Sequence, residues 1–378
     1  MNENYVTLGQ VCTKGSSNIA QKDLAEREGQ YPIYGAAGLI KNVDFAHQKQ
    51  SYIAVVKDGA GIGRVMKLPA YSSVIGTMQY IFPKENVDID YLFYALQHMN
   101  LGKYFSGSTI PHIYFRDYQK ERLKLPVMEV QQRQADTLSR IDALSAYGQR
   151  QIALMDEIVK SRFVEMFGLP GTDAHGWGMS SLGEICEINP KKSQDARLTN
   201  GLLVSFVSMP SVSESGDIDT TQVKPYDEVK TGFTYFAEND VLFAKITPCM
   251  ENGKGAVATG LYNGIGFGST EFHVLRPAKE TATPCWIYTL TVFPQFRIDA
   301  ASNMTGSAGQ RRVPASFLEN YRVSVPPLEL QNRFAAFVAE VDKSKFRIQK
   351  SLSTSRKLWT MAQIDAIMNM DFSTQRSL

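Results

Sequence analysis

The chain contains the same run of residues twice, and this internal repeat strongly limits the folds that it can adopt. Residues 123–133 read LKLPVMEVQQR, and residues 323–333, two hundred positions later, read VSVPPLELQNR. In both runs a proline is followed five positions later by a glutamine and seven positions later by an arginine. A chain that repeats itself at this distance is expected to fold as two copies of one module.

A long amphipathic helix is predicted to follow each copy of the repeat. Mostly apolar residues recur at alternating separations of three and four, from Leu138 to Met166 and from Val338 to Ala366, in one shared heptad register. This period is typical of helices that pack against another helix. Met155, Phe163, Met166 and Trp359 are compatible with this helix seam and equally with a docking surface for a partner helix.

The starts of both helices are marked by residue type. Pro126 and Pro326 stand at the starts, and Glu129 and Glu329 lie in the first turns, where a carboxylate complements the helix dipole. The first helix delivers the chain to the second module, so a second helix that packs against it must run antiparallel. The sequence therefore predicts a molecule with approximate twofold symmetry, in which the helices act as a spacer.

Shorter matches precede the helices, in the same order in both copies. Residues 8–12 correspond to 182–186, residues 52–57 to 241–245, and residues 91–96 to 285–290. The segments between them differ, and matching of glycines makes the loop after residues 241–245 four residues longer than the loop after 52–57. A shared framework with different loops is expected of two domains that keep one scaffold and read different targets.

Local patterns predict an α+β fold for each module. Residues 52–56 and 78–82 read as buried strands, 91–99 as a helix and 122–125 as a closing strand, and the second module repeats this order. The predicted divisions are a first module at residues 1–125, a central helix at 126–167, a linker and second module at 168–325, and a distal helix at 326–370.

Composition restricts the class of protein. The 378 residues are 43% apolar and 21% charged, which is typical of a globular chain of two or three domains. No apolar run approaches the roughly 18 residues that span a bilayer, and there is no signal segment, so a cytoplasmic location without membrane contact is expected. Cys12, Cys186, Cys249 and Cys285 form no C-x-x-C pair and are expected to be reduced packing residues. The scattered histidines predict no metal site.

The net charge of +2 does not by itself indicate a nucleic-acid-binding protein. Basic residues nevertheless gather in the segments that differ between the copies, several beside glycines, where a backbone can approach a phosphate closely. The run 310–312 is matched with 111–113, and its different sequence is expected if the halves read different bases. The candidate DNA-binding residues are Lys57, Arg64, Lys67, His112 and Arg116 in the first module, and Lys191, Lys192, Lys245, Lys254, Arg311 and Arg312 in the second. For any single residue, ordinary solvated surface is the alternative.

No convincing catalytic set is present. Residues 59–63 read GAGIG after a strand, but no βαβ continuation follows, which favours a turn or a DNA-facing loop over a dinucleotide site. Residues 252–255 lack the P-loop pattern. Glu228 and Lys230, with Asp217 and Asp219 upstream, resemble the acidic cluster of a metal-dependent nuclease, but the first copy has no counterpart. We expect no nucleophile, base and orienter set.

The duplicated pattern resembles the specificity subunit of type I restriction-modification enzymes over nearly the whole chain. The residues that carry the resemblance are Leu8-Gly9 and Leu182-Gly183-Glu184-Ile185, Val56-Lys57 to Gly63-Arg64, Gly107-Ser108-Thr109, the Pro-x(4)-Gln-x-Arg runs at Pro126 and Pro326, and Phe167-Gly168 followed by Trp177.

The resemblance implies a particular fold and role. Two homologous target recognition domains would be separated by a pair of long antiparallel coiled-coil helices, and each would read one half of a bipartite sequence in double-stranded DNA. The helices would dock two methyltransferase subunits, and a restriction-translocase subunit would join the larger assembly. The chain itself would do no chemistry and hold no cofactor, whereas its partners would use S-adenosylmethionine, ATP and magnesium. The alternatives are a DNA-binding scaffold unconnected with methylation and a metal-dependent nuclease.

Overall fold

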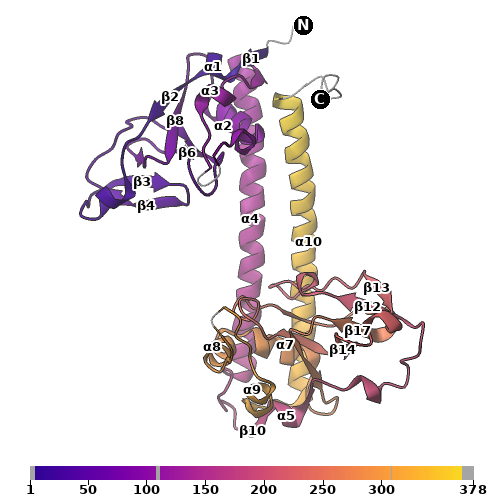
Figure 1. Ribbon diagram of the computed structural model, residues 1–378. Coiled ribbons are helices and arrows are strands. Elements are labelled where there is room, and N and C mark those ends of the chain that lie inside the picture. The colour runs from indigo at the N-terminus through magenta and orange to yellow at the C-terminus, as the bar shows by residue number, and fades with distance from the viewer. Residues whose placement is uncertain (1–4, 108–110, 308, 368–378) are drawn as a thin grey trace. The chain divides into compact units, whose positions relative to one another are not determined.

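The computed structural model describes residues 5–107, 111–307 and 309–367, with side chains as far as residue 359. Ser108, Thr109 and residues 368–370, which the sequence reading included, lie outside the described residues. The chain divides into two compact units, residues 1–150 with 348–378 and residues 151–347. Each unit contains a globular domain and parts of both long helices, α4 (Met128–Phe167) and α10 (Leu328–Ile367) (Figure 1).

The first unit combines three small sheets with short helices. The sheets are β1 (Tyr5–Thr7) with β9 (Arg122–Lys124); β2 (Cys12–Ser16), β8 (Met78–Pro83), β5 (Tyr52–Val56) and β6 (Val65–Leu68); and β4 (Gly38–Val43), β3 (Tyr31–Gly35) and β7 (Ser73–Val74). The helices are α1 (Leu8–Val11), α2 (Ile89–His98) and α3 (Phe115–Tyr118), with 3-10 turns η1 (Gln21–Leu24) and η2 (Leu101–Tyr104). The predicted strands at 52–56, 78–82 and 122–125 and the helix at 91–99 are confirmed within one or two residues.

The second unit repeats the central sheet in the same strand order. The sheets are β10 (Met179–Ser181) with β19 (Arg322–Ser324); β11 (Cys186–Ile188), β18 (Phe272–Pro277), β15 (Val241–Ala244) and β16 (Gly255–Val257); and β13 (Val223–Pro225), β12 (Leu203–Val207), β17 (Ile265–Gly268) and β14 (Thr234–Ala237). The helices are α5 (Leu182–Ile185), α6 (Tyr226–Val229), α7 (Pro284–Val292), α8 (Pro294–Ser302) and α9 (Ala315–Asn320), with 3-10 turns η3 (Lys192–Gln194), η4 (Met209–Ser211) and η5 (Tyr262–Gly264).

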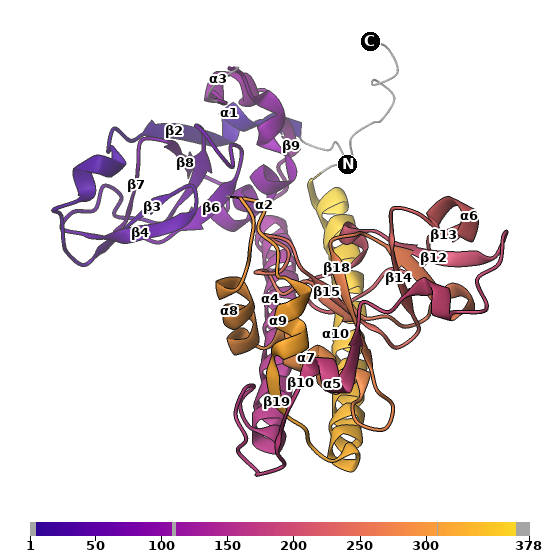
Figure 2. The ribbon, with the colours of Figure 1, turned by 60° about the horizontal axis from the view of Figure 1, so that its bottom comes forward.

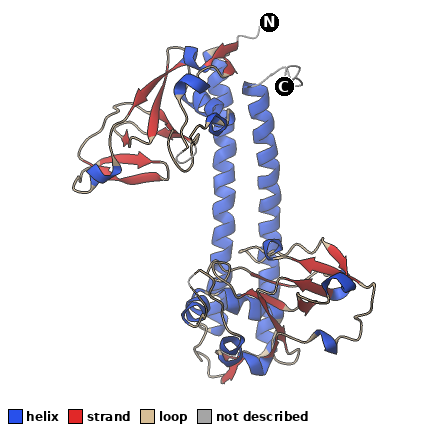
Figure 3. Ribbon diagram, viewed as in Figure 1, coloured by secondary structure: helices blue, strands red, loops and turns tan. Residues whose placement is uncertain are grey.

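The two units therefore share a scaffold and differ at its periphery. The sheet β2-β8-β5-β6 corresponds strand by strand to β11-β18-β15-β16, and all its neighbouring strands are antiparallel in both units. The additional sheet has three strands in the first unit and four in the second, where Figure 2 shows β12, β13 and β14 beside α6 (Figure 2). Helices and strands are interleaved in both domains, which confirms the predicted α+β class (Figure 3).

The matched openings of the two copies have a common geometry. Thr7 and Ser181 form capping boxes with Gln10 and Glu184, respectively, and the amide of each N-cap residue donates to the side chain of its partner. A Cβ at Gly183 would lie only 2.9 Å from the Glu319 carbonyl oxygen, so the second residue of this Leu-Gly pair has no room for a side chain.

Each core joins a helix of the domain to the long helices. In the first unit Leu92 of α2 and Ile53 of β5 are fully buried in one cluster with Leu138 of α4. In the second unit Trp286 of α7 is buried with Phe163 of α4 and Phe334 of α10. A duplicated core of this kind needs the long helix as one of its walls, because burial of apolar side chains supplies most of the stabilisation.

A buried glutamine, here called the glutamine joint, connects each domain to its long helix. The Gln131 Oε1 atom accepts a hydrogen bond from the amide of Asp88 (2.9 Å), and its Nε2 donates to the carbonyl oxygens of Asn86 (3.0 Å) and Pro126 (2.8 Å). Asp88 is the N-cap of α2, so the joint ties the start of one helix to the start of another.

The second unit builds the same joint with different surroundings. The Gln331 Oε1 atom accepts from the amide of Thr283 (2.8 Å), the N-cap of α7, and Nε2 donates to the carbonyl oxygens of Thr281 (2.9 Å) and Pro326 (2.8 Å). Both glutamines are at most 1% exposed. This contact gives a physical reason for the Pro-x(4)-Gln spacing, since the proline carbonyl and the glutamine amide must meet across the first turn.

The long helices pack antiparallel within each unit, as predicted. In the first unit Trp359 of α10 packs against the core cluster that contains Leu138 of α4, whereas Gly148, further along α4, faces the earlier residue Leu352. A Cβ at Gly148 would lie 2.7 Å from Leu352 Cδ2, so the glycine admits a side chain of the opposite helix.

In the second unit Asp156 forms an ion pair with Lys345, and Phe163 packs against Phe334 with ring centroids 5.6 Å apart. Of the residues with two possible roles, Phe163 lies in the core, and Met166 and Trp359 pack partly against core clusters. These contacts favour the seam.

The cysteines have the predicted packing role. All four are free thiols, and Cys12 and Cys186 are buried at the ends of α1 and α5. Burial raises the pKa of both thiols to about 12, so they remain protonated at neutral pH.

Candidate nucleic-acid interface

In each unit, several of the predicted basic residues gather where the inner strand β5 or β15 of the central sheet ends. The chain leaves β5 at Lys57 and β15 at Lys245, and a later segment crosses each end. The amide of Ile113 donates to the Lys57 carbonyl oxygen and the amide of Val313 donates to that of Lys245, both at 2.9 Å. Short bridges join Asp58 to His112 and Ile246 to Arg312.

These bridges correct the predicted alignment by one position. The sequence reading matched residues 310–312 with 111–113, but the hydrogen bonds make Arg312 the equivalent of His112 and Val313 that of Ile113. The register is defined by the backbone pairing and not by the residue types. Both equivalent positions, 112 and 312, are occupied by a basic side chain.

The loop that follows β5 or β15 is two residues longer in the second unit, not four. The ladders pair Val55 with Val65 and Phe243 with Gly255, which are separated by 10 and 12 positions. The glycines used for the prediction are not in register, because Gly63 is a turn residue and Gly255 already belongs to β16.

The first unit brings three of its five candidates together. The His112 Nδ1 atom lies 2.7 Å from an Asp58 carboxylate oxygen, and Lys57 Nζ lies 3.6 Å from the other. The half-exposed Tyr114 ring stacks on His112, and the Arg116 guanidinium lies over the same ring, 4.7 Å from its centroid. Cations beside an exposed aromatic ring can contact both phosphates and bases.

The other two candidates of the first unit are held elsewhere. The Arg64 Nη1 atom donates to the Ala36 carbonyl oxygen at 2.7 Å, and Lys67 forms an ion pair with Asp90 on α2. The GAGIG run is the turn of the antiparallel β5–β6 hairpin, which confirms a turn and not a strand-to-helix dinucleotide loop.

In the second unit the two adjacent arginines have acidic partners. Arg312 binds Glu271 through two hydrogen bonds of 2.8 and 2.9 Å, and Arg311 lies 3.2 Å from Glu251. The Arg312 guanidinium lowers the pKa of Glu271. Burial lowers the pKa of the Lys245 ammonium; the Glu271 carboxylate opposes this effect and the smaller influence of Arg312 adds to it.

An open groove of about 440 Å³ lies beside this cluster. Its most informative lining residues are Lys192, Lys230 and Lys245, with the exposed Phe233. Lys192 donates to the Lys230 carbonyl oxygen, and Phe233 packs edge-on against Phe206 with centroids 5.0 Å apart. Three ammonium groups and an aromatic ring around one groove suit an anionic backbone and its bases.

Lys191 is exposed next to this groove, whereas Lys254 donates to the Met209 carbonyl oxygen at 3.2 Å and does not line it. Lys230 and Phe233 were not predicted as groove residues; Lys230 was considered only as part of a nuclease-like cluster. Gly232, which adopts a φ of +80°, was the available signal for a special loop at this point.

The nuclease residues do not assemble. Asp217 accepts hydrogen bonds from Ser213 and Ser215, and Asp219 accepts from Thr221. Within residues 5–107, 111–307 and 309–367 there is no group of three His, Cys, Asp or Glu side chains able to hold a metal ion. The described helices also include none that is long and apolar enough to cross a membrane.

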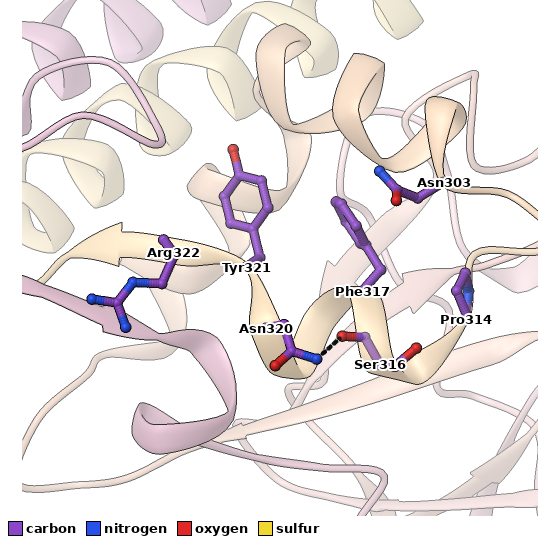
Figure 4. Close-up of a pocket in the computed structure, with 7 residues that line it drawn as sticks. All are labelled: Asn303, Pro314, Ser316, Phe317, Asn320, Tyr321 and Arg322. Carbon is purple, nitrogen blue, oxygen red and sulfur yellow. Dashed lines mark hydrogen bonds between the residues drawn. The ribbon is translucent and has the colours of Figure 1, made fainter.

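A second cavity, of about 350 Å³, lies between α9 and the end of α8 (Figure 4). Its lining includes Phe317 and Tyr321, which pack against the buried Phe296, and Asn320, which donates to the Ser316 carbonyl oxygen at 2.7 Å. Arg322, which also lines this cavity, donates to the Met179 carbonyl oxygen. The cavity is therefore an aromatic surface pocket and not part of the basic groove.

Comparison with known proteins yields one consistent group. The sequence profile described as "Type I restriction modification DNA specificity domain" matches residues 2–154 and 174–355. Two Escherichia coli proteins, the specificity subunits of the type I restriction enzymes EcoAI and EcoEI, are 43% and 42% identical over 161 residues. This segment is 42% of the chain and 26% of each relative, so the match spans about a quarter of their length.

A solved structure shares the fold. The S subunit of a type I restriction-modification system from M. genitalium aligns over 98% of both chains with a TM-score of 0.58, at 15% sequence identity.

Proposed function

The chain belongs to the family defined by the type I restriction-modification DNA specificity domain, and on this premise we propose that it is the non-catalytic subunit that selects the DNA sequence for a restriction-modification complex. Each domain reads one half of a bipartite target in double-stranded DNA. The chemistry of methyl transfer and cleavage belongs to partner subunits, which bring S-adenosylmethionine, ATP and magnesium.

One observation carries this proposal: the same four-stranded sheet occurs twice and presents a different basic rim each time. The first rim combines Lys57, His112 and Arg116 with Tyr114, and the second combines Lys192, Lys230 and Lys245 with Phe233. Identical scaffolds with different rims suit two readers of unlike half-sites, because phosphate contacts position a protein and base contacts give specificity.

The candidate residues are expected to contribute unequally to DNA binding. Lys57, His112, Arg116, Lys191, Lys192, Lys245 and Arg311 lie at the rims, and Arg312 positions this surface through Glu271. Arg64, Lys67 and Lys254 are hydrogen-bonded to other groups of the chain, so their contribution to phosphate binding should be smaller.

Methyltransferase subunits are proposed to dock on the long helices. In the first unit α4 exposes Leu144 and Tyr147, each 62% exposed, and in the second it exposes Leu154 and Ile158, 53% and 51% exposed. Each pair has the spacing of neighbours on one helix face, which is how a helix presents apolar anchors to a partner. The number of methyltransferase subunits is proposed to be two, one for each half, with a restriction-translocase subunit in the larger assembly.

The long helices are proposed to set the spacing between the two half-sites. This follows from the domain division proposed from the sequence, at residues 1–125, 126–167, 168–325 and 326–370. Inserting four residues after Ile152 would lengthen α4 by about 6 Å, which corresponds to slightly under two base pairs. The proposal predicts an unchanged pair of half-sites with a spacer longer by one or two base pairs.

The decisive experiment is co-expression of the chain with a type I methyltransferase subunit in a methylation-free host, followed by sequencing of the methylated bases. A bipartite methylated sequence that depends on this chain supports the proposal. Methyl transfer by the purified chain alone, or no dependence of the methylated sequence on the chain, would contradict it.

A further inference from the structure

The loop between β15 and β16 contacts an unusual internal side chain. Arg297, on α8, is only 7% exposed, and its guanidinium lies over the Phe243 ring, 4.6 Å from the centroid. Nη1 donates to the Met250 carbonyl oxygen at 2.8 Å and Nη2 to that of Gly253 at 3.2 Å. Both acceptors belong to the loop at residues 245–254.

This arginine has no carboxylate partner among the described residues, and its buried Nε atom has no hydrogen-bond partner there. Burial of an unpaired cation is unfavourable, and an apolar side chain of similar volume would fill the same space more easily. Stability alone is therefore a poor reason for an arginine at this position. The two loop carbonyls are what the guanidinium specifically recognises.

The equivalent loop of the first unit is held by a different device. A Cβ at Gly63 would lie 2.3 Å from the Gly102 amide nitrogen, so the shorter loop rests directly on the backbone of η2. The second loop is two residues longer and is held in a different way, by hydrogen bonds from the buried Arg297. Because the arginine contact fixes only the second loop, the conformation of this loop is expected to suit the target of the second domain.

The same loop lies between the groups assigned to DNA. Lys245 stands at its start, and Glu251 on its outer side is paired with Arg311. Asn252 of this loop is exposed, and its amide side chain is able to form two hydrogen bonds with the edge of an adenine in the major groove.

We propose that the loop at residues 245–254 reads bases of the second half-site, with Asn252 as the contacting side chain and Arg297 as the positioning residue that fixes the loop. The inference rests on the proposed function and adds to it the identity of the reading element. Arg297 itself stays inside the domain and touches no DNA.

The test uses the full chain co-expressed with its methyltransferase subunit and compares methylated sequences. Asn252→Ala should reduce discrimination at one base pair of the second half-site by roughly tenfold, because a bidentate base contact is lost. Arg297→Met should relax the same base pair, and Arg297→Lys, which can donate to one carbonyl at a time, should restore part of the preference. The first half-site and the spacer should stay unchanged in all three variants.

A purely structural role of Arg297 would lower the yield of methylation at every site and leave the base preference intact, so preference and yield are scored separately. Thermal unfolding of each variant shows whether it is folded. If Arg297→Met does not fold, Asn252→Ala decides, because Asn252 is exposed and its replacement leaves the core unchanged.

An unchanged second half-site in a folded Asn252→Ala or Arg297→Met variant overturns the inference. A wild-type complex that methylates no bipartite sequence would instead overturn the proposed function, so the two failures are distinguishable.

Discussion

Replacing the joint glutamines by methionine should destabilise the chain far more than replacing their exposed neighbours. Gln131→Met leaves the Asp88 amide and the carbonyl oxygens of Asn86 and Pro126 without their partner inside the protein. Each buried polar group left unpaired costs about 1–3 kcal/mol, and since Asn86 is exposed and its carbonyl oxygen can be hydrated instead, the loss should be about 2–3 kcal/mol. Gln331→Met should cost the same in the second unit, since Gln331 also makes three hydrogen bonds.

Urea unfolding followed by circular dichroism measures this effect. With a slope of about 2 kcal/mol per molar urea, the midpoint of the transition of the affected unit should fall by about 1–1.5 M. Gln132→Met and Asn332→Met are matched controls, because both residues are adjacent to the joints and exposed. A midpoint that falls by less than about 0.5 M, or by no more than in the controls, would refute the assignment of the joints as structural connections.

Three further predictions concern charge, pH and helix packing. Arg311→Ala should reduce the slope of log affinity for DNA against log salt by about 0.9, the value for one phosphate contact; a slope equal to that of the wild type would remove Arg311 from the interface. Arg197 holds the pKa of Asp195 down at about 2, so this carboxylate stabilises the fold above its ordinary pKa of 3.8 and the contribution is lost as pH falls towards 2. Asp195→Asn should therefore reduce the difference in urea midpoint between about pH 5 and about pH 3, and an unchanged difference would contradict this. Gly148→Ile should destabilise the first unit by about 1–3 kcal/mol, because its side chain meets Leu352, and Leu352→Ala should recover part of the loss in a double-mutant cycle.

The scaffold could be predicted from the sequence because its signals are local. Strand β5, residues Tyr52–Val56, is an unbroken buried run, and the 40-residue helix α4 follows from a heptad pattern with a marked start. The peripheral sheets could not be predicted in this way. Strand β3 pairs in parallel with β7, and β12 pairs in parallel with β17, contacts that join distant segments and have no local pattern.

The candidate interface was predicted in composition but not in geometry. Lys192 and Lys245 do line one groove, but Lys230 enters it through a loop whose conformation depends on Gly232. Arg312 was predicted as a candidate DNA-binding residue, whereas its guanidinium is engaged by Glu271, 41 positions away. Which cations remain available depends on such long-range partners, and no spacing rule supplies them.

The glutamine joints have a consequence for how such chains can change. Every partner of Gln131 and Gln331 is a main-chain amide or carbonyl group. Each joint therefore depends on the position of the backbone and not on which side chains the domain carries. A foreign domain that presents a helix start at the same place would be accepted by the same glutamine without any compensating mutation. Recombination can thus exchange gene segments that encode such domains. Each new domain brings its own target preference and is held by the same glutamine contact, which does not have to change.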